Sequence, residues 1–197
     1  MNIRVIHPAP DLPPRRAFNV DDIRHMIEAG VISEEERFEL IEGEIVVMSP
    51  ASVGHDDLQN ILNLALAKAV PVGLYVGNGS TIQLADNVLI LPDLAVISRK
   101  VYKGGDRKRF ARPTAQDVLL VIEISVSSLT YDCKAKARLY ARHGIREYWV
   151  IDANELRTWI HAGPSGDGWT SIVECGPDDL LTTPAVPDFS IRLSDID

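Results

Sequence analysis

The stretch that decides the fold spans residues 117–152 and reads DVLLVIEISVSSLTYDCKAKARLYARHGIREYWVID. Its first part, residues 118–124, is apolar except for Glu123, which is typical of a central strand covered on both faces. A helix is expected over Thr130–His143, and Glu147–Asp152 has the composition of a second buried strand. A strand, a helix and a strand in this order predict a parallel β–α–β unit with a right-handed crossover.

Upstream of this unit, the sequence predicts one long helix and two further strands. The helix spans Gly54–Val70 and carries apolar residues at helical spacing along one face. Strand-like residues follow at Leu74–Val76, continuing into Thr81–Leu84, and then at Val88–Ile97. The core order is therefore helix, three strands, helix, strand, which predicts an α/β fold. The apolar face of the long helix consists of Leu58, Ile61, Leu62, Ala65, Leu66 and Ala69.

Both ends of the chain are expected to add β-structure to this core. Arg37–Met48 is predicted to form an N-terminal β-hairpin, and 156–160 with 169–173 a C-terminal β-hairpin. Residues 1–17 contain four prolines, which favours an extended arm or a loose terminus. We expect residues 18–197 to form a single domain.

Composition excludes several classes of protein. The net charge of −8 argues against a protein that coats nucleic acid through bulk charge. Two cysteines, Cys133 and Cys175, cannot build a disulfide framework or a cysteine zinc site, and they suit a reducing cytosol. The first residues lack a secretory h-region, and the longest apolar run, 118–122, is far below the roughly 20 residues that cross a bilayer. We therefore expect a cytoplasmic protein without a membrane span.

Two carboxylates interrupt the predicted apolar strands. Asp93 follows Pro92, and because proline removes a donor from the strand ladder, the pair marks a place where a strand bends or ends. An ordinary turn aspartate would also explain it. Glu123 is expensive to bury unless it is paired or bound to a metal. The alternative for Glu123 is an edge strand whose glutamate faces water.

A lysine on the following helix completes a possible site. Asp132 and Lys136 are four residues apart and share one helix face, which also suits an ordinary surface ion pair. Asp93 and Glu123 on neighbouring strands would form a hard-oxygen site suited to Mg²⁺ or Mn²⁺. A nearby ammonium group can orient the attacking water and offset charge on a phosphate.

This pattern resembles the PD-(D/E)XK nuclease superfamily and, within it, the Uma-type family, which is assigned as restriction endonucleases. The resemblance covers roughly Arg37 to Asp152, and its last two segments are the most specific. The segments that carry it are RFELIEGEIVVMSP (37–50), Gly54-His55, LPDLAVIS (91–98), VIEISVSSLTYD (121–132) and KARLYARHGIREYWVID (136–152).

The resemblance implies a restriction-endonuclease-like core and a Mg²⁺- or Mn²⁺-dependent endonuclease that hydrolyses DNA phosphodiester bonds with metal-activated water. It makes Asp93 and Glu123 the metal carboxylates. The superfamily signature places a lysine two residues after Glu123, where this chain has Ser125. In the resembled family the lysine has moved to the helix, which here corresponds to Lys136; Lys134 matches that position less well.

Two residues before the core also fall on positions that resemble the family. Glu39 would add a carboxylate to the site, or it is simply the polar member of an alternating hairpin arm. His55 would contact a phosphate or hold a carboxylate, or it is a residue that caps the helix.

A basic segment lies between the Pro-Asp strand and the Glu strand. Residues 99–112 contain seven basic residues against one acid, in a chain whose net charge is −8. We expect Arg107, Lys108 and Arg109 to contact DNA phosphates; a solvated loop or a subunit contact would also explain the segment.

The sequence is also compatible with two other functions. The first is a module that has kept the nuclease fold without catalysis and binds nucleic acid or protein. The second is an interaction protein that forms an oligomer through an exposed region around Tyr148 and Trp149. The nuclease itself is expected to be a homodimer, because nucleases often act as dimers to reach both strands.

Overall fold

The structure is a computed structural model that describes residues 5–6, 13–33, 35–48, 52–102 and 112–196. The chain forms two compact units. The first unit contains residues 1–50 and 81–91, and the second contains 51–80 and 92–197.

The first unit is built on a four-stranded antiparallel sheet with the strand order β4-β3-β7-β6. The predicted N-terminal hairpin is confirmed, and Glu42 and Gly43 at its turn have positive φ angles. At Gly43 a Cβ atom would lie 2.9 Å from Ala17 Cβ, so this close approach requires glycine. The elements of the first unit are β1 (Val5–Ile6), β2 (Arg15–Arg16), α1 (Val20–Glu28), β3 (Phe38–Ile41), β4 (Glu44–Val47), β6 (Ile82–Ala85) and β7 (Val88–Ile90).

In the predicted N-terminal arm, the described residues form the two-residue antiparallel pair β1–β2. Helix α1 begins at a capping box in which Asn19 and Asp22 bond to each other's backbone N–H groups. Its buried residue Ile23 joins a small apolar core whose other members are Ile32, Leu40 and Leu89.

The second unit contains a six-stranded sheet with the order β12-β11-β10-β9-β8-β5. Strands β9 and β10 are parallel, as predicted for the β–α–β unit, and the remaining pairs are antiparallel. Its elements are α2 (Val53–Ala69), β5 (Leu74–Asn78), β8 (Leu94–Ser98), η1 (Arg99–Tyr102), β9 (Val118–Ser125), α3 (Leu129–Tyr131), the π-helical turn η2 (Asp132–Lys136), α4 (Ala137–Arg142), β10 (Glu147–Asp152), β11 (Arg157–Ser165), β12 (Gly168–Cys175), β13 (Leu181–Thr183), β14 (Val186–Ile191) and η3 (Leu193–Asp195).

Two strand-like stretches are divided between the two sheets. The sequence predicts a strand at 74–76 that continues into 81–84, and another over 88–97 that bends or ends at Pro92-Asp93. In the structure each stretch is broken, and its halves belong to different sheets. The first break falls at Gly79, whose φ of 56° suits a turn. The second falls at Pro92, which has no N–H to donate to a ladder. The chain therefore leaves the second unit after Ser80 and returns to it at Pro92.

Two further elements differ from the sequence-based expectation. The predicted helix over 130–143 consists of α3, η2 and α4, so a π-helical turn interrupts it. The predicted C-terminal hairpin is confirmed as β11–β12 and is longer than expected, and a second hairpin, β13–β14, follows it. Pro184 and Pro187 obscure this second hairpin in the sequence, because proline normally argues against a strand.

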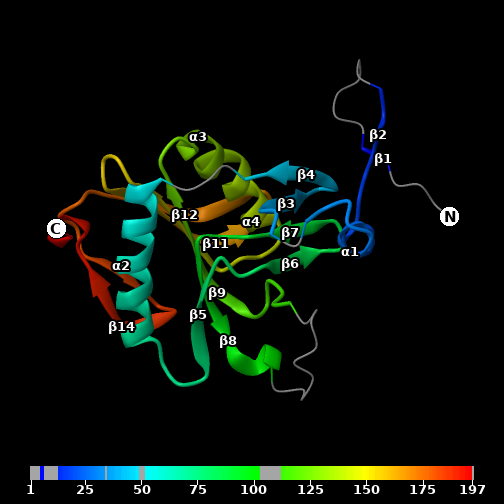
Figure 1. The fold of residues 1–197 in the computed structure, drawn as a ribbon. Coiled ribbons are helices and arrows are strands. Elements are labelled where there is room, and N and C mark those ends of the chain that lie inside the picture. The colour runs from blue at the N-terminus through cyan, green and yellow to red at the C-terminus, as the bar shows by residue number, and fades with distance from the viewer. Residues whose placement is uncertain (1–4, 7–12, 34, 49–51, 103–111, 197) are drawn as a thin grey trace. The chain divides into compact units, whose positions relative to one another are not determined.

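Alternation along β9 separates the core of the second unit from its polar residues. Leu120, Ile122 and Ile124 join the large apolar core, to which α2 contributes the predicted stripe residues Leu58, Leu62 and Leu66. Helix α2 packs against β5, β9 and β14 (Figure 1). Successive strand residues point to opposite faces, so Glu123 and Ser125 face the other side of the sheet.

Candidate active site

Asp93 is fixed by contacts to three elements of the second unit. Its Oδ2 accepts a hydrogen bond from the Ile124 backbone N–H at 2.8 Å, and its Oδ1 lies 3.1 Å from His55 Nε2. Its backbone carbonyl accepts from Gln59 Nε2 at 2.8 Å and from the Gly79 N–H at 3.1 Å. The break at Pro-Asp thus produces a buried carboxylate that bonds to the neighbouring strand, rather than an exposed turn aspartate.

Glu123 lies on the central strand β9 with 4% of its surface exposed. The edge-strand alternative is therefore wrong. Its Oε1 accepts two hydrogen bonds, from Lys136 Nζ at 2.9 Å and from the Tyr140 hydroxyl at 2.6 Å. A carboxylate in such an apolar strand is tolerated because charged and polar donors on the following helix meet it.

Lys136 is buried as well, with 5% exposure, so the surface-ion-pair alternative is wrong. Its ammonium group contacts Glu123, as expected for a lysine that serves the site from the helix. Asp132 does not form this ion pair. Its Oδ2 accepts two hydrogen bonds instead, from the Ser125 hydroxyl at 2.7 Å and from the Ser128 hydroxyl at 2.5 Å.

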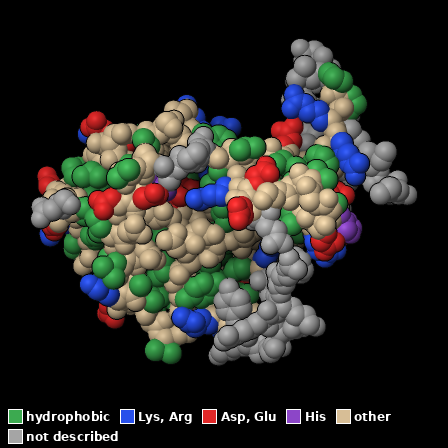
Figure 2. All heavy atoms as spheres, in the orientation of Figure 1, with side chains coloured by type: hydrophobic (Ala, Val, Ile, Leu, Met, Phe, Trp, Pro, Cys, Tyr) green, Lys and Arg blue, Asp and Glu red, His purple; other side chains and the backbone are tan. Residues whose placement is uncertain are grey.

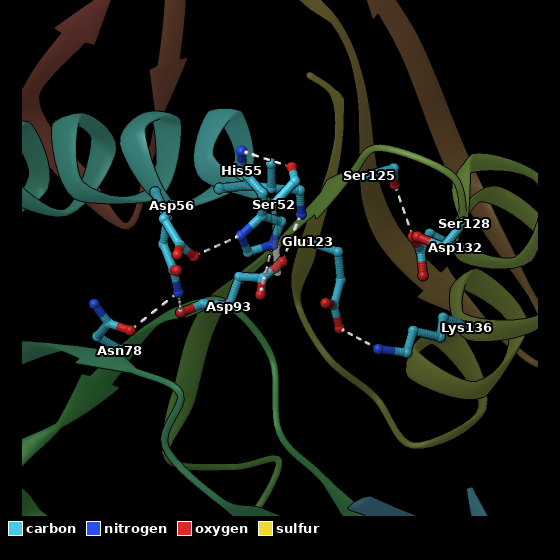
Figure 3. Close-up of polar contacts among 12 residues, drawn as sticks. Ser52, His55, Asp56, Asn78, Asp93, Glu123, Ser125, Ser128, Asp132 and Lys136 are labelled. Atoms are coloured by element: carbon cyan, nitrogen blue, oxygen red, sulfur yellow. Dashed lines mark hydrogen bonds and ion pairs between the residues drawn. The ribbon is translucent and has the colours of Figure 1, made fainter. Parts of the chain in front are cut away.

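The two carboxylates meet at one short stretch of β9. Asp93 bonds to the N–H of Ile124, the residue directly after Glu123. Figure 3 shows both carboxylates between His55 of α2 and Lys136 of η2. Among the residues that the structure describes, no group of three or more His, Cys, Asp or Glu side chains could hold a metal ion. A cation at this place would therefore rely on two protein carboxylates, and Mg²⁺ is often held in this way with water and phosphate oxygens as its other ligands.

Ser125 stands where the superfamily signature has lysine, and its hydroxyl ties the end of β9 to Asp132 at the start of η2. Its assignment as a catalytic residue stays a prediction. Two further residues of the site are not among those predicted from the sequence: Ser128 bonds to Asp132, and Tyr140 bonds to Glu123. The sequence does contain a sign of their role, because residues four apart lie on the same helix face. The residues with this spacing are Ser128, Asp132, Lys136 and Tyr140.

The π-helical turn η2 has a specific set of partners. The Asp132 carbonyl accepts from the Ala137 N–H five residues later and from the Tyr148 hydroxyl at 3.2 Å. Such turns are rare and frequently lie at functional sites. Cys133 lies in this turn, but burial, with the charges of Asp132 and Asp152, raises the pKa of its thiol to about 11. A raised pKa disfavours the thiolate, which is the nucleophilic form of cysteine.

His55 occupies the first turn of α2, where its ring contacts two aspartates. Ser52 is the N-cap, with Oγ accepting from the His55 N–H at 3.3 Å, so the capping interpretation of His55 is wrong. Its Nε2 faces Asp93 and its Nδ1 lies 3.4 Å from Asp56 Oδ1. The bond to Asp93 raises the pKa of His55 above the usual 6.5, against the opposing effect of burial. His55 therefore holds a carboxylate, one of the two roles expected for it.

Glu39 belongs to β3 of the first unit and is 2% exposed, so this polar member of the hairpin arm is buried. Its Oε1 accepts from the Leu91 N–H at 3.0 Å, at the point where the chain leaves the first unit. A contribution of Glu39 to the metal site stays a prediction.

The basic segment falls largely outside the described residues. Arg107, Lys108 and Arg109 lie within 103–111, so the structure does not test their contact with DNA. Arg99 at the start of the segment is described: its Nε donates to the Leu74 carbonyl at 3.0 Å, and its guanidinium lies 5.5 Å from the Tyr75 ring centre.

A mixed α/β fold with two buried carboxylates and a lysine at one place is typical of restriction-endonuclease-like nucleases. Residues 20–194 match the Uma2 family, which is described as "Putative restriction endonuclease". The chain belongs to this family, which confirms the resemblance noted in the sequence and indicates a nuclease of this class.

A solved structure supports the fold. The crystal structure of "a putative nuclease belonging to DUF820" from Anabaena variabilis ATCC 29413 superimposes with a TM-score of 0.70. The alignment covers 91% of this chain and 97% of that chain at 16% sequence identity. A comparison with curated proteins found no match. None of the described helices is both long and apolar enough to cross a membrane.

The His55–Asp93 contact makes a testable prediction about protonation. In the metal-free protein, Asp93→Asn should lower the pKa of His55, because Asp93 is the main cause of its elevation. Asp56→Asn is the matched control and should lower it less, since Asp56 contributes less. NMR titration of the His55 ring measures both values. An unchanged His55 pKa in Asp93→Asn would contradict the assigned contact.

The same shift fixes the sign of a pH effect on stability. Because the pKa of His55 is higher in the folded protein than in the unfolded chain, the contact stabilises the fold below about pH 6.5. That contribution disappears as the pH rises through the folded-state pKa. Asp93→Asn should therefore reduce stability more at about pH 6 than at about pH 9 through this contact, which urea unfolding of the wild type and the variant at the two pH values measures.

Proposed function

We propose that this protein is a divalent-metal-dependent endonuclease that hydrolyses DNA phosphodiester bonds with metal-activated water. The observation that carries the proposal is the pair of buried carboxylates at residues 93 and 123 with the Lys136 ammonium bonded to one of them. Family membership supports the nuclease class. The metal, the DNA substrate and the roles of the residues are our inference.

The donor set fits a hard cation. Asp93 and Glu123 offer carboxylate oxygens, which Mg²⁺ and Mn²⁺ prefer over softer ligands. When bound, such an ion activates water as a nucleophile and stabilises the charge that develops on the phosphate. Asp93 and Glu123 would hold the ion, and His55 orients Asp93 from α2.

Lys136 supplies a fixed positive charge at this site. Its ammonium group is held against Glu123 Oε1 at 2.9 Å in a buried position, where electrostatic effects are stronger than in water. A charge placed in this way can orient the attacking water or offset charge on the phosphate. These are the tasks of the lysine that the superfamily signature places two residues after the glutamate.

A second candidate function is a nuclease-fold module that binds nucleic acid or protein without cleaving it. The observation that favours it is Ser125, which stands at the signature lysine position and bonds to Asp132. The contact of Lys136 with Glu123 returns an ammonium group to the site. We therefore favour the enzyme over the inactive module. The expectation of an exposed oligomer-forming region at Tyr148 and Trp149 is wrong, because both side chains are fully buried.

The proposal includes a DNA-binding segment, a homodimer and a cytoplasmic location. On the face drawn in Figure 2, basic and acidic side chains of the described residues are interspersed rather than gathered by sign. Attraction of DNA by an acidic chain then requires a local basic patch, and residues 99–112 are the candidate.

The role of Lys136 can be separated from its effect on folding. Lys136→Met should reduce single-turnover cleavage at saturating Mg²⁺ by about 10²–10³-fold, the scale for losing one charge-stabilising group. It should also lower stability by up to several kcal/mol, because Glu123 loses a buried partner. Rates are therefore compared well below the melting temperature, with EDTA as the metal-free control.

Lys134→Met is the matched variant, since Lys134 lies in the same turn but is exposed. It should cleave like the wild type. Equal rates for Lys136→Met and the wild type would rule out the assignment of Lys136.

The basic segment is tested by the salt dependence of DNA binding. Replacing Arg107, Lys108 and Arg109 together with alanine should weaken binding and reduce the slope of log K against log salt by up to about 3, one unit for each lost phosphate contact. A control that replaces Arg24, Lys68 and Arg192 removes the same charge elsewhere and should leave the slope near the wild-type value. Equal slopes for the two triple variants would show a solvated loop instead.

A further inference from the structure

Two side chains meet at one oxygen of Glu123. Lys136 and Tyr140, four residues apart, both donate to Oε1, the phenol at 2.6 Å and the ammonium at 2.9 Å. A length of 2.6 Å is typical of a hydroxyl that donates to an ionised carboxylate, for which about 2.5–2.7 Å is usual. The phenol and the ammonium group therefore hold Glu123 Oε1 in place together.

The Tyr140 ring is held more rigidly than the lysine chain. It is fully buried, and its centroid lies 4.6 Å from that of Tyr148 at an interplanar angle of 58°. Tyr148 is fully buried as well and bonds through its own hydroxyl to the Asp132 carbonyl of η2. A phenol has few rotatable bonds, whereas a lysine has a flexible four-carbon stem. Packing of the rings thus fixes where the Tyr140 hydroxyl, and with it Glu123 Oε1, can lie.

Neighbouring contacts hold the ring pair against the sheet. Trp169 of β12 stacks on Tyr148 with centroids 6.3 Å apart, and its Nε1 donates to the Ala137 carbonyl at 2.9 Å. Ala137 directly follows Lys136, so this bond fixes the backbone between the two donors. Ring packing and the Trp169 bond thus support the segment that carries Lys136 and Tyr140, while the Tyr148 hydroxyl itself bonds to the Asp132 carbonyl.

We propose that Tyr140 is a positioning residue that orients Glu123 for a divalent cation. The inference rests on the proposed function, because it takes Glu123 as a carboxylate that holds the ion. Groups that bond to a metal-binding carboxylate set its orientation, and losing one commonly reduces metal affinity by about 10–100-fold. Tyr140 acts through Glu123 and is not assigned a contact with the substrate.

The test measures Mn²⁺ affinity by calorimetry, without DNA, for the wild type, Tyr140→Phe and Tyr148→Phe. Both variants keep their ring and lose one buried hydroxyl, so a purely structural role predicts similar losses of thermal stability and the same Mn²⁺ affinity in both. Positioning of Glu123 predicts that Tyr140→Phe weakens Mn²⁺ binding by about 10-fold or more, while Tyr148→Phe binds like the wild type.

A double-mutant cycle provides an independent check. In a Glu123→Gln background, Tyr140→Phe should cause no further loss of Mn²⁺ affinity if the phenol acts through Glu123. Wild-type affinity in Tyr140→Phe, or an equal further loss in the Glu123→Gln background, would overturn the inference.

The outcomes also separate this inference from the proposed function. Mn²⁺ binding that weakens in Tyr140→Phe, in a wild-type protein that does not cleave DNA, would overturn the nuclease and support the positioning role. A wild-type protein that binds no Mn²⁺ would overturn both.

Discussion

The structure of the second unit depends on one buried interaction, the contact of the Glu123 carboxylate with Lys136 and Tyr140. Glu123 lies in the middle of an apolar central strand, where an unpaired charge would be strongly destabilising. The helix after β9 must therefore bring two donors to a single point. The π-helical turn, the bond of Asp132 to two serines and the stacked rings of Tyr140 and Tyr148 all lie in the segment that meets this requirement.

The same strand serves two purposes because its side chains alternate. One face of β9 joins the apolar core under α2, and the other carries Glu123 and Ser125 towards α3, η2 and α4. Asp93 reaches this strand from a different direction, since the chain re-enters the second unit at Pro92 and the carboxylate bonds to the backbone of Ile124. The break in the apolar run at Pro92 is thus what allows a carboxylate to be placed beside Glu123.

Much of this arrangement could be predicted from the sequence. The apolar run around Glu123, the stripe on α2 and the strand–helix–strand order all follow from periodicity, and the family resemblance that they support is confirmed. The irregular positions near Gly79 and Pro92 could be predicted from glycine and proline, but local apolar composition does not show that the two halves of a run join different sheets. Tyr140 was overlooked since a tyrosine on an apolar helix face normally signals core packing. The π-helical turn depends on tertiary contacts of the Asp132 carbonyl, which periodicity does not reveal.

The central claim is that Asp93 and Glu123 share one divalent cation. An anomalous difference map from crystals grown with Mn²⁺ tests it most directly, because the ion itself is located. The account predicts one peak with an oxygen of each carboxylate at a distance of about 2.0–2.6 Å, the range for hard cations. A well-ordered site without such a peak, or a peak bound by neither Asp93 nor Glu123, would contradict it.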